Sequence, residues 1–214
     1  MRAAEQEAQI WKIDRSVYTG AMFQSTRERL IAAGARLMSE NGYQGTGLAE
    51  ILSAAGVPKG SFYHHFASKE AFAIEVLRGM ADASARRLEE DLLSKTGSAR
   101  DRLRNLVQHA IEYYDGVSCR HGSLLMQLGG EVSHNFPAIG EEIAADLRRL
   151  EQVWVAFAED ARRAGDIGAE YDPKWLGLHL FMLYEAAVAW MRINGETTPL
   201  MNYLEMVDRF LGSS

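Results

Sequence analysis

The chain has 214 residues, of which 47% are hydrophobic and 24% are charged. This is ordinary globular usage, so a disordered, collagen-like or low-complexity chain is excluded. The formal net charge of −6 by itself argues against nucleic acid as a partner, because phosphate contacts need lysine and arginine. The acidic excess lies in residues 73–214, whereas residues 22–72 carry five basic and four acidic residues. Any contact with DNA must therefore lie in the first third of the chain.

The single cysteine, Cys119, excludes an internal disulfide framework and a multi-thiolate zinc site, and it fits a reducing cytosol. The first ten residues lack the apolar stretch of a secretory signal. The longest apolar runs fall far short of the roughly 18 residues that a membrane helix needs. We therefore expect a cytoplasmic protein that does not enter a membrane and that needs no cofactor or metal.

The first third of the chain is predicted to begin with an extension and two helices. Residues 1–24 lack a sustained apolar period and are expected to be poorly ordered. Ser25 or Thr26 can cap a first helix, which ends at the Asn41-Gly42 pair because glycine suits a left-handed conformation there. Thr46 is expected to cap the short second helix.

A third helix is predicted from Pro58 to Phe66, because proline suits a first helical turn, where its missing N–H is not needed. Ser68 can cap a fourth helix that runs to about Leu93. Two short helices joined by a tight, glycine-containing turn are typical of a helix-turn-helix. The second helix of such a unit enters the major groove of DNA.

Beyond Gly97 the apolar pattern remains helical, and no β pattern competes with it. Further helices are expected around residues 103–114, 124–133, 139–164, 174–193 and 199–211. The predicted fold class is all-α with about nine helices. It comprises a helix-turn-helix domain over residues 25–72 and a second helical domain over residues 73–214.

The predicted third helix has two different faces. Phe62 and Phe66 stand at positions i and i+4 and should both face the core. The outward residues offer hydrogen-bond donors and no carboxylate, as contacts to phosphates and base edges require; they are Lys59, Gly60, Tyr63 and His64, with Ser61 at the edge. Lys69 and the free N–H groups at the start of the fourth helix form a second expected anion site. The same pattern also fits an ordinary three-helix subdomain with a polar surface.

Four motifs occur in register in this segment: Thr26-x-x-x-Leu30, Asn41-Gly42-Tyr43, Gly56-Val57-Pro58-Lys59-Gly60-Ser61-Phe62-Tyr63-His64-His65-Phe66 and Ser68-Lys69-Glu70-Ala71-Phe72. With them, residues 26–72 resemble the DNA-binding domain of TetR-family transcriptional repressors. The resemblance implies a homodimer on a palindromic, double-stranded operator. It also implies a set of DNA-binding residues: Thr26, Thr46, Lys59, Gly60, Ser61, Tyr63, His64 and Lys69.

The resemblance implies that the last two helices form the dimer interface, with Trp175, Leu178, Leu183, Val207, Phe210 and Leu211 as candidates. It further implies a pocket for a small-molecule inducer, built largely from residues 98–165. Amphipathic and aromatic groups are typical of such pockets, and the candidates are His109, Tyr113, Tyr114, Cys119, Ser123, Met126, Trp154, Phe157, Tyr184 and Glu185. Any of these residues could instead belong to an ordinary core.

A narrower resemblance rests on Arg120-His121-Gly122-Ser123-Leu124, Glu131-Val132 and Phe136-Pro137. These motifs resemble the NemR-like and AcuR-like branch of the family, which includes electrophile-sensing repressors. In that branch a cysteine commonly follows the glycine, where this chain has Ser123. Cys119 lies four residues earlier, beside Arg120 and His121, and neighbouring positive charge can lower the pKa of a thiol. The sequence leaves open whether Cys119 is a reactive sensor or an inert thiol.

An enzyme is not expected, because the sequence has no glycine-rich phosphate loop, HExxH pair or nucleophile elbow. The predicted function is that of a ligand-responsive repressor. In this mechanism the inducer favours a conformer in which the fourth helix pivots, so that the two recognition helices no longer match half-sites about 34–36 Å apart. A transcriptional activator and a helical ligand-binding protein that does not touch DNA are the alternatives.

Overall fold

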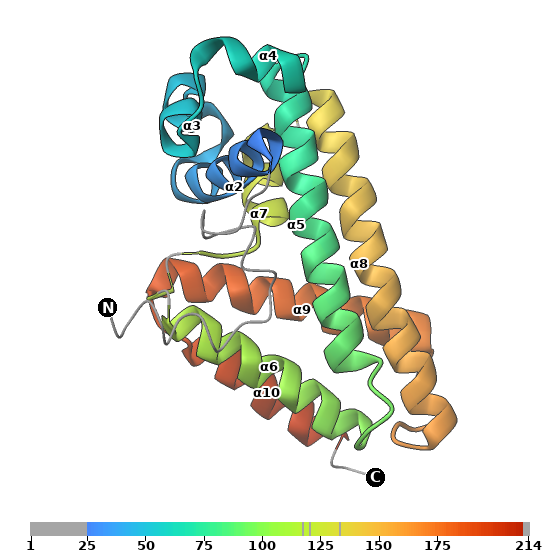
Figure 1. The fold of residues 1–214 in the computed structure, drawn as a ribbon. Coiled ribbons are helices and arrows are strands. Elements are labelled where there is room, and N and C mark those ends of the chain that lie inside the picture. The colour runs from blue at the N-terminus through green and yellow to red at the C-terminus, as the bar shows by residue number, and fades with distance from the viewer. Residues whose placement is uncertain (1–24, 117, 120, 133, 212–214) are drawn as a thin grey trace. The chain divides into compact units, whose positions relative to one another are not determined.

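The computed structural model describes residues 25–116, 118–119, 121–132 and 134–211. Within these residues it contains nine α-helices, one short 3₁₀ turn and no strand, which confirms the all-α prediction (Figure 1). The predicted extension, residues 1–24, lies outside the described part, as do Arg120 and the side chain of Phe210.

The chain forms two compact units. One consists of the described residues up to Ala83 together with Leu124–Asp146, and the other consists of Ser84–Ser123 together with the described residues from Leu147 onward. The long helices α5 (Lys69–Leu92) and α8 (Pro137–Ala164) contribute to both. The predicted domain boundary at residue 72 does not coincide with these units, and it stays a prediction.

In the first unit, α2 (Thr26–Gly45) is capped by Ser25, one of the two predicted caps, and it begins with a capping box. The Ser25 hydroxyl accepts a hydrogen bond from the Glu28 N–H at 3.2 Å, and the Glu28 carboxylate accepts one from the Ser25 N–H at 3.1 Å. Gly42 interrupts the helix with φ 75° and ψ 177°. Only glycine adopts a positive φ of this kind at little cost, so the break falls at the predicted residue.

The predicted cap of the second helix is wrong. The short helix α3 (Leu48–Ala55) starts from Gly47, whose N–H donates to the Glu50 carboxylate at 2.9 Å. Thr46 instead ends α2: its side chain is fully buried, and its hydroxyl donates to the Gly42 carbonyl at 2.7 Å. A threonine near a helix break can bond to the backbone on either side, and here the preceding turn is the partner.

The predicted helix from Pro58 to Phe66 is a 3₁₀ turn (Lys59–Ser61) followed by the single-turn helix α4 (Phe62–His65). Pro58 itself is extended, with ψ 146°, and its carbonyl accepts the Ser61 N–H at 2.9 Å. Since this bond spans three residues, the segment starts as a 3₁₀ turn. The segment ends because Phe66 is extended (φ −137°, ψ 132°).

Three phenyl rings fix this short segment to the unit's core. Phe62, Phe66 and Phe72 are all buried, and their ring centroids lie between 4.8 and 5.4 Å apart. A Cβ at Gly34 of α2 would collide with the Phe72 ring, so α2 approaches α5 closely at this point. The rings therefore hold α4 against two longer helices. The helix α7 (Leu124–Val132) packs on α2 in the same unit.

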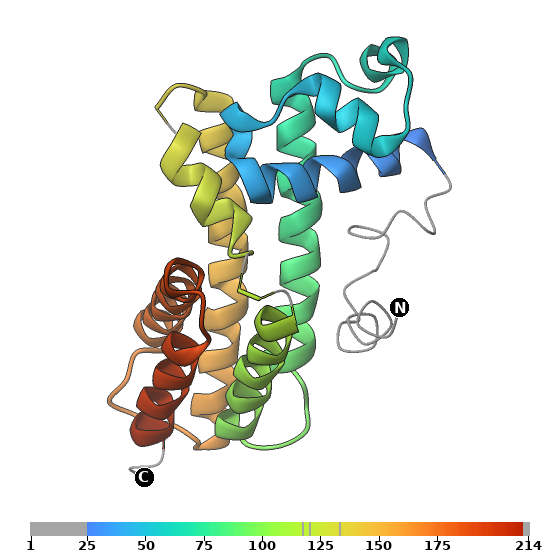
Figure 2. The ribbon, with the colours of Figure 1, turned by 90° about the vertical axis from the view of Figure 1, so that its left-hand side faces the viewer.

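The second unit contains α6 (Ala99–Gly116), α9 (Pro173–Asn194) and α10 (Thr198–Leu211), with parts of α5 and α8. In this unit α10 packs on both α6 and α9 (Figure 2). The Asp208 carboxylate joins α10 to α6 by accepting hydrogen bonds from Arg100 at 2.9 Å and Arg104 at 2.5 Å. The helix α9 lies against the α8 backbone, because a Cβ at Gly177 would stand only 2.6 Å from the Cα of Val155.

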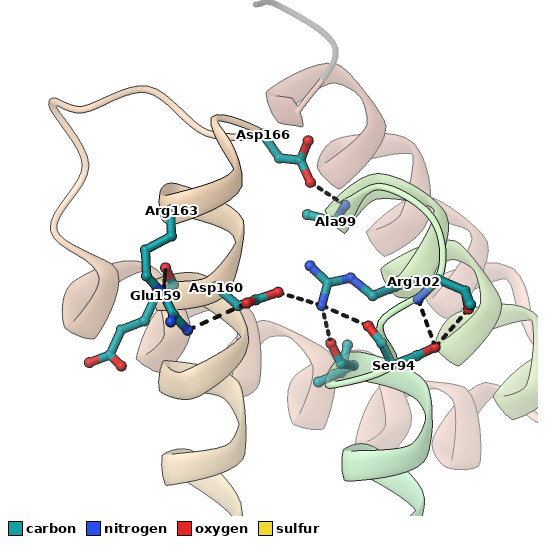
Figure 3. A network of polar contacts seen from close by, with 9 residues as sticks. Ser94, Ala99, Arg102, Glu159, Asp160, Arg163 and Asp166 are labelled. Carbon is teal, nitrogen blue, oxygen red and sulfur yellow. Dashed lines mark hydrogen bonds and ion pairs between the residues drawn. The ribbon is translucent and has the colours of Figure 1, made fainter.

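A buried arginine ties the ends of three helices together in this unit (Figure 3). Arg102 of α6 is 4% exposed. Its Nη1 donates to the carbonyls of Leu92 at 2.9 Å and Ser94 at 3.2 Å, and to Asp160 Oδ2 at 2.8 Å. Leu92 closes α5 and Asp160 belongs to α8, so one guanidinium satisfies an otherwise unpaired helix end and pairs with a carboxylate.

Among the described residues, α9 is long and apolar enough to span a membrane by length and composition, with a mean hydropathy of 1.2. The uninterrupted apolar runs within α9 are much shorter than a membrane span, as expected from the sequence. The expectation counted uninterrupted apolar runs, and α9 passes only as an average because polar residues interrupt it. In the structure, Gly177 packs on α8 and Glu185 is buried, so we assign α9 as a core helix of the second unit.

Candidate functional site

The 3₁₀ turn and α4 present a polar surface in the first unit. We call this surface the donor face, and it consists of Lys59, Gly60, Ser61, Tyr63 and His64. Ser61 is half-buried, the other four residues are exposed, and Tyr63 is 66% exposed. The prediction that the polar side chains of this segment face outward and its phenyl rings face the core is confirmed, since Phe62 and Phe66 are buried. No acidic residue occurs between Glu50 and Glu70, so the donor face lies in a stretch of chain free of carboxylates.

Gly60 is a residue that the fold does not require. A Cβ placed there would meet nothing within 4 Å, and Gly60 is not among the residues with positive φ. A larger residue would therefore fit within the chain itself. A glycine in such a position allows another molecule to approach the backbone closely.

Lys69, the predicted second anion site, is partly used inside the unit. Its Nζ donates to the Tyr43 carbonyl at 2.6 Å and lies 4.4 Å from the centroid of the Tyr43 ring. Burial lowers the pKa of Lys69, while the nearby Glu131 carboxylate acts in the opposite direction. An ammonium has three donors, so a phosphate contact by Lys69 stays a prediction.

The two predicted threonines differ. Thr26 is half-buried, and its hydroxyl accepts a hydrogen bond from Arg29 Nη2 at 3.4 Å. Thr46 is fully buried with its hydroxyl donated to the backbone. The structure therefore offers no exposed Thr46 side chain for DNA, and we leave this residue out of the interface.

Glu131 is a positioning residue that the sequence did not reveal. Its carboxylate, on α7, accepts the N–H groups of Tyr43 at 2.9 Å and Gln44 at 2.7 Å. A Cβ at Gly42 would collide with this carboxylate. Glu131 and Lys69 thus both bond to the backbone in the end of α2 that follows the Gly42 break and leads into α3, a segment that we call the α2–α3 junction. No local sequence signal predicts a contact between residues 88 positions apart.

The predicted pocket residues are divided between the units. Met126 belongs to α7 of the first unit and is 44% exposed, while the others lie in the second unit. There, Cys119, Trp154, Phe157 and Glu185 are buried, Tyr113, Tyr114, Ser123 and Tyr184 are half-buried, and His109 is exposed. His109 Nδ1 lies 3.1 Å from the Asp91 carboxylate, so its partner is structural.

A cluster of aromatic and charged groups surrounds Tyr184 in the second unit. The Tyr184 ring centroid lies 5.5 Å from that of Trp154 and 5.8 Å from that of Tyr203. Arg87 and Asp91, both on α5, are close enough to influence the pKa of Tyr184, which burial raises. Burial also lowers the pKa of Arg87.

Glu185, the next residue on α9, is the most strongly perturbed carboxyl group of the second unit. It is 8% exposed. Burial raises its pKa to about 7, although a hydrogen bond with Ser123 acts in the lowering direction. With this pKa the group is about half protonated near pH 7 and largely protonated below it. The sequence named both residues as candidates but did not pair them.

The argument for a reactive Cys119 is not supported by its surroundings. The thiol is 3% exposed, and burial is the main cause that raises its pKa. Asp115 and Glu196 raise the pKa further, which is the opposite of the lowering expected from a basic neighbourhood. A protonated, covered thiol is a poor nucleophile, so this conformation corresponds to the inert alternative.

The predicted dimer residues are partly exposed. Trp175 and Leu183 are 50% and 45% exposed, Leu178 and Leu211 are half-buried, and Val207 is buried within the unit at 1%. Val207 is therefore a core residue, because its position on α10 faces α6 and α9 instead of solvent. Five other large apolar side chains of α9 and α10 are also exposed, and the sequence did not name them as dimer candidates: Met182, Trp190, Ile193, Met201 and Met206.

Among the described residues, no group of three or more His, Cys, Asp or Glu side chains could hold a metal ion.

Two family models match the chain. The model of bacterial regulatory proteins of the tetR family matches residues 30–76. The model of the tetracyclin repressor-like C-terminal domain matches residues 99–207. The first match contains the donor face, and the second contains Tyr184 and Glu185 of α9.

Individual proteins give the same result. The HTH-type transcriptional repressor NemR of Escherichia coli (strain K12) is 42% identical over 140 residues, which cover 65% of this chain and 68% of NemR. The transcriptional regulator AcuR of Cereibacter sphaeroides is 29% identical over 186 residues, covering 85% and 83%. A crystal structure of a regulatory protein TetR from Rhodobacter sphaeroides superposes with a TM-score of 0.81 at 28% identity, over 86% of this chain and 98% of that chain.

Proposed function

Because this chain belongs to the TetR family of helix-turn-helix transcriptional regulators, we propose that it is a homodimeric repressor that a small molecule releases from a palindromic DNA operator. The observation that carries the proposal is the donor face. It offers exposed donors from one short segment, and the buried phenyl rings behind it fix their direction. Side chains fixed in this way suit contacts to base edges and phosphates.

Because the chain has a net negative charge, a surface without carboxylates supports the proposal that this surface contacts DNA. In a chain of net charge −6, a random surface segment would be expected to carry carboxylates, which repel the phosphate backbone. The donor face instead carries Lys59 and His64 beside the phenol of Tyr63, with Gly60 open to a close approach. We assign phosphate contacts to Lys59, Thr26 and Lys69, and groove contacts to Ser61, Tyr63 and His64.

The second unit supplies the other two parts of the function. Its buried polar and aromatic groups around Tyr184 and Glu185 suit a small-molecule site. The exposed apolar side chains of α9 suit burial against a second copy of the chain, because isolated soluble proteins rarely leave such patches uncovered. We infer a cytoplasmic location and no catalytic role, in keeping with the transcriptional regulators that the chain resembles.

DNA binding is tested by fluorescence anisotropy with the DNA upstream of the chain's own coding sequence. Lys59→Ala should weaken binding and reduce the slope of log affinity against log salt by about one for each lost phosphate contact. Tyr63→Ala should abolish the specific complex, and Tyr63→Phe isolates the contribution of the hydroxyl. Lys95→Ala, an exposed lysine in the loop after α5, is the matched control and should leave both quantities unchanged.

Unchanged binding in both Lys59→Ala and Tyr63→Ala would remove the donor face from the interface. If no DNA complex forms even at low salt, the alternative of a ligand-binding protein without DNA binding is favoured. Transcription in vitro from the bound promoter distinguishes a repressor from an activator by the sign of its effect.

A further inference from the structure

Several buried polar atoms of the second unit have no hydrogen-bond partner, among them one on Glu185 and one on Trp154. One is Oε2 of Glu185, on a side chain that is 92% buried, and the other is Nε1 of Trp154, whose side chain is fully buried. Buried polar atoms in folded proteins are almost always paired, with protein or with an ordered small molecule. Both residues lie in the neighbourhood of Tyr184, whose ring contacts Trp154 and whose hydroxyl interacts electrostatically with Glu185.

The chemistry of these atoms defines what they lack. The indole N–H of Trp154 can donate a hydrogen bond and cannot accept one. Ser123 forms a hydrogen bond with Glu185, and because Oε2 has no partner, this bond involves Oε1. Oε2 is then left to carry the proton when the carboxyl group is neutral. Since burial raises the pKa of Glu185 to about 7, the neutral acid prevails at lower pH. Both unpaired atoms are then donors, and both require an acceptor.

We propose that Glu185 and Ser123 form a recognition site for a small uncharged molecule with a carbonyl oxygen, which accepts the Oε2–H hydrogen bond of Glu185. The inference deepens the proposed function and rests on its ligand-binding part. The Trp154 N–H is the second donor for an acceptor oxygen, and the Trp154 and Tyr184 rings provide aromatic surface. A buried anion is disfavoured because Arg87 already lies 3.9 Å from Asp91, so this cation is matched by a carboxylate.

Other titratable groups of the unit must be separated from Glu185 in any pH experiment. They come from four helices and from the segment before α7: Arg87 and Asp91 on α5, His109, Tyr113 and Tyr114 on α6, His121 beside Ser123, Tyr184 and Arg192 on α9, and Tyr203 on α10. Of these groups, only the two histidines ordinarily titrate between pH 5 and 8. His109→Gln and His121→Gln are therefore the controls, and neither should change the pH profile of binding.

The test uses the full chain and three probes of similar shape: acetophenone, the 1-phenylethylammonium cation and benzoate. Binding is followed by titration calorimetry and by the indole N–H signal of Trp154, which Trp154→Phe assigns. Acetophenone should bind most tightly, and its affinity should fall about tenfold per pH unit above about pH 7, as the acid loses its proton. It should also shift the Trp154 signal.

Variants of the two residues sharpen the test. Glu185→Gln keeps a donor without a titratable proton, so acetophenone should bind with no pH dependence between pH 5.5 and 8. Ser123→Ala should move the midpoint to higher pH, because the Ser123 hydrogen bond lowers the pKa of Glu185. Glu185→Leu should weaken binding at least tenfold at pH 6. Since Glu185→Gln preserves shape, the proposal remains testable if the leucine variant does not fold.

Several results would overturn the proposal: tighter binding of the cation with affinity that rises with pH, preferred binding of benzoate, an unchanged affinity in Glu185→Leu, or no binding of acetophenone. Anisotropy with operator DNA on the same preparations separates the two levels of inference. If DNA binding depends on the donor face and acetophenone does not bind, the carbonyl site alone fails. If acetophenone binds as expected and no DNA complex forms, the proposed repressor function fails and the site stands.

Discussion

Arg102→Met tests whether the buried guanidinium is a main support of the second unit. Methionine keeps the aliphatic stem that packs inside, and it removes the Nη1 group that serves Leu92, Ser94 and Asp160. One Nη1 has two hydrogens, so these three contacts amount to about two full bonds. Hydrogen bonds to charged groups contribute about 1.5–3 kcal/mol each to stability.

Two corrections reduce this sum. Asp160 is 45% exposed, so water can replace its lost partner and the ion pair contributes little. Arg102 Nε is buried without a partner, so the native arginine already carries a desolvation cost that methionine removes. The Leu92 carbonyl loses a buried partner, and this accounts for most of the effect. We expect a loss of about 3 kcal/mol, or roughly 6–12 °C in Tm for a chain of this size.

Thermal unfolding followed by circular dichroism provides the measurement. Arg163→Met is the matched control, because Arg163 contacts the same Asp160 at 3.4 Å and is 76% exposed. Its substitution should change the stability by less than about 0.5 kcal/mol. Equal Tm shifts in the two variants, or a Tm shift below about 2 °C for Arg102→Met, would show that the buried contacts of Arg102 are not a main support of the second unit.

Three further outcomes follow from the packing and the pKa values. Gly177→Ala should destabilise the chain by about 1–3 kcal/mol, because the added methyl group overpacks against the α8 backbone. Gly79→Ala, at an open helical site, should instead stabilise it by about 0.5–1 kcal/mol. Equal Tm values for the two variants would contradict the close contact between α9 and α8. Glu185 holds its proton more tightly in the folded state, so the free energy of unfolding should fall as the pH rises from 4.5 to about 7, by about 3 kcal/mol at most. Urea titrations of Glu185→Gln should lack this fall. An unchanged pH slope in this variant would count against the raised pKa. Glu131→Ala should lower the free energy of unfolding in urea by about 1–3 kcal/mol, because two N–H groups lose a carboxylate acceptor. Glu131→Gln should have an intermediate effect. An unchanged free energy of unfolding in both variants would show that Glu131 does not stabilise the α2–α3 junction.

The sequence predicted the helices well because helix signals are local. The Ser25 cap, the Gly42 break and the limits of α8, α9 and α10 depend on residues within a few positions of each other. The errors fall where a local signal has two solutions. Thr46 could bond forward or backward along the chain, and Pro58 could start a helix or precede a 3₁₀ turn.

Only part of the candidate site could be predicted from the sequence. The donor face follows from the i, i+4 spacing of Phe62 and Phe66, which fixes its direction. Partners far apart in the chain could not be predicted, because nothing local in the sequence links Glu131 to Tyr43. The environment of Cys119 shows the same limit, since the sequence names its adjacent basic residues and not the carboxylates of Asp115 and Glu196 that face it.

The unit that carries the donor face is not continuous along the chain, because it takes in Leu124–Asp146. A ribosome releases residues at about 5–20 per second, and N-terminal parts begin to fold first. The 65 residues from Ala67 through Glu131 therefore correspond to a delay of roughly 3–13 s at that rate. During this time the nascent helix-turn-helix lacks the carboxylate that holds the α2–α3 junction. Prematurely terminated products that end before Glu131 should then compete poorly with complete chains for the operator.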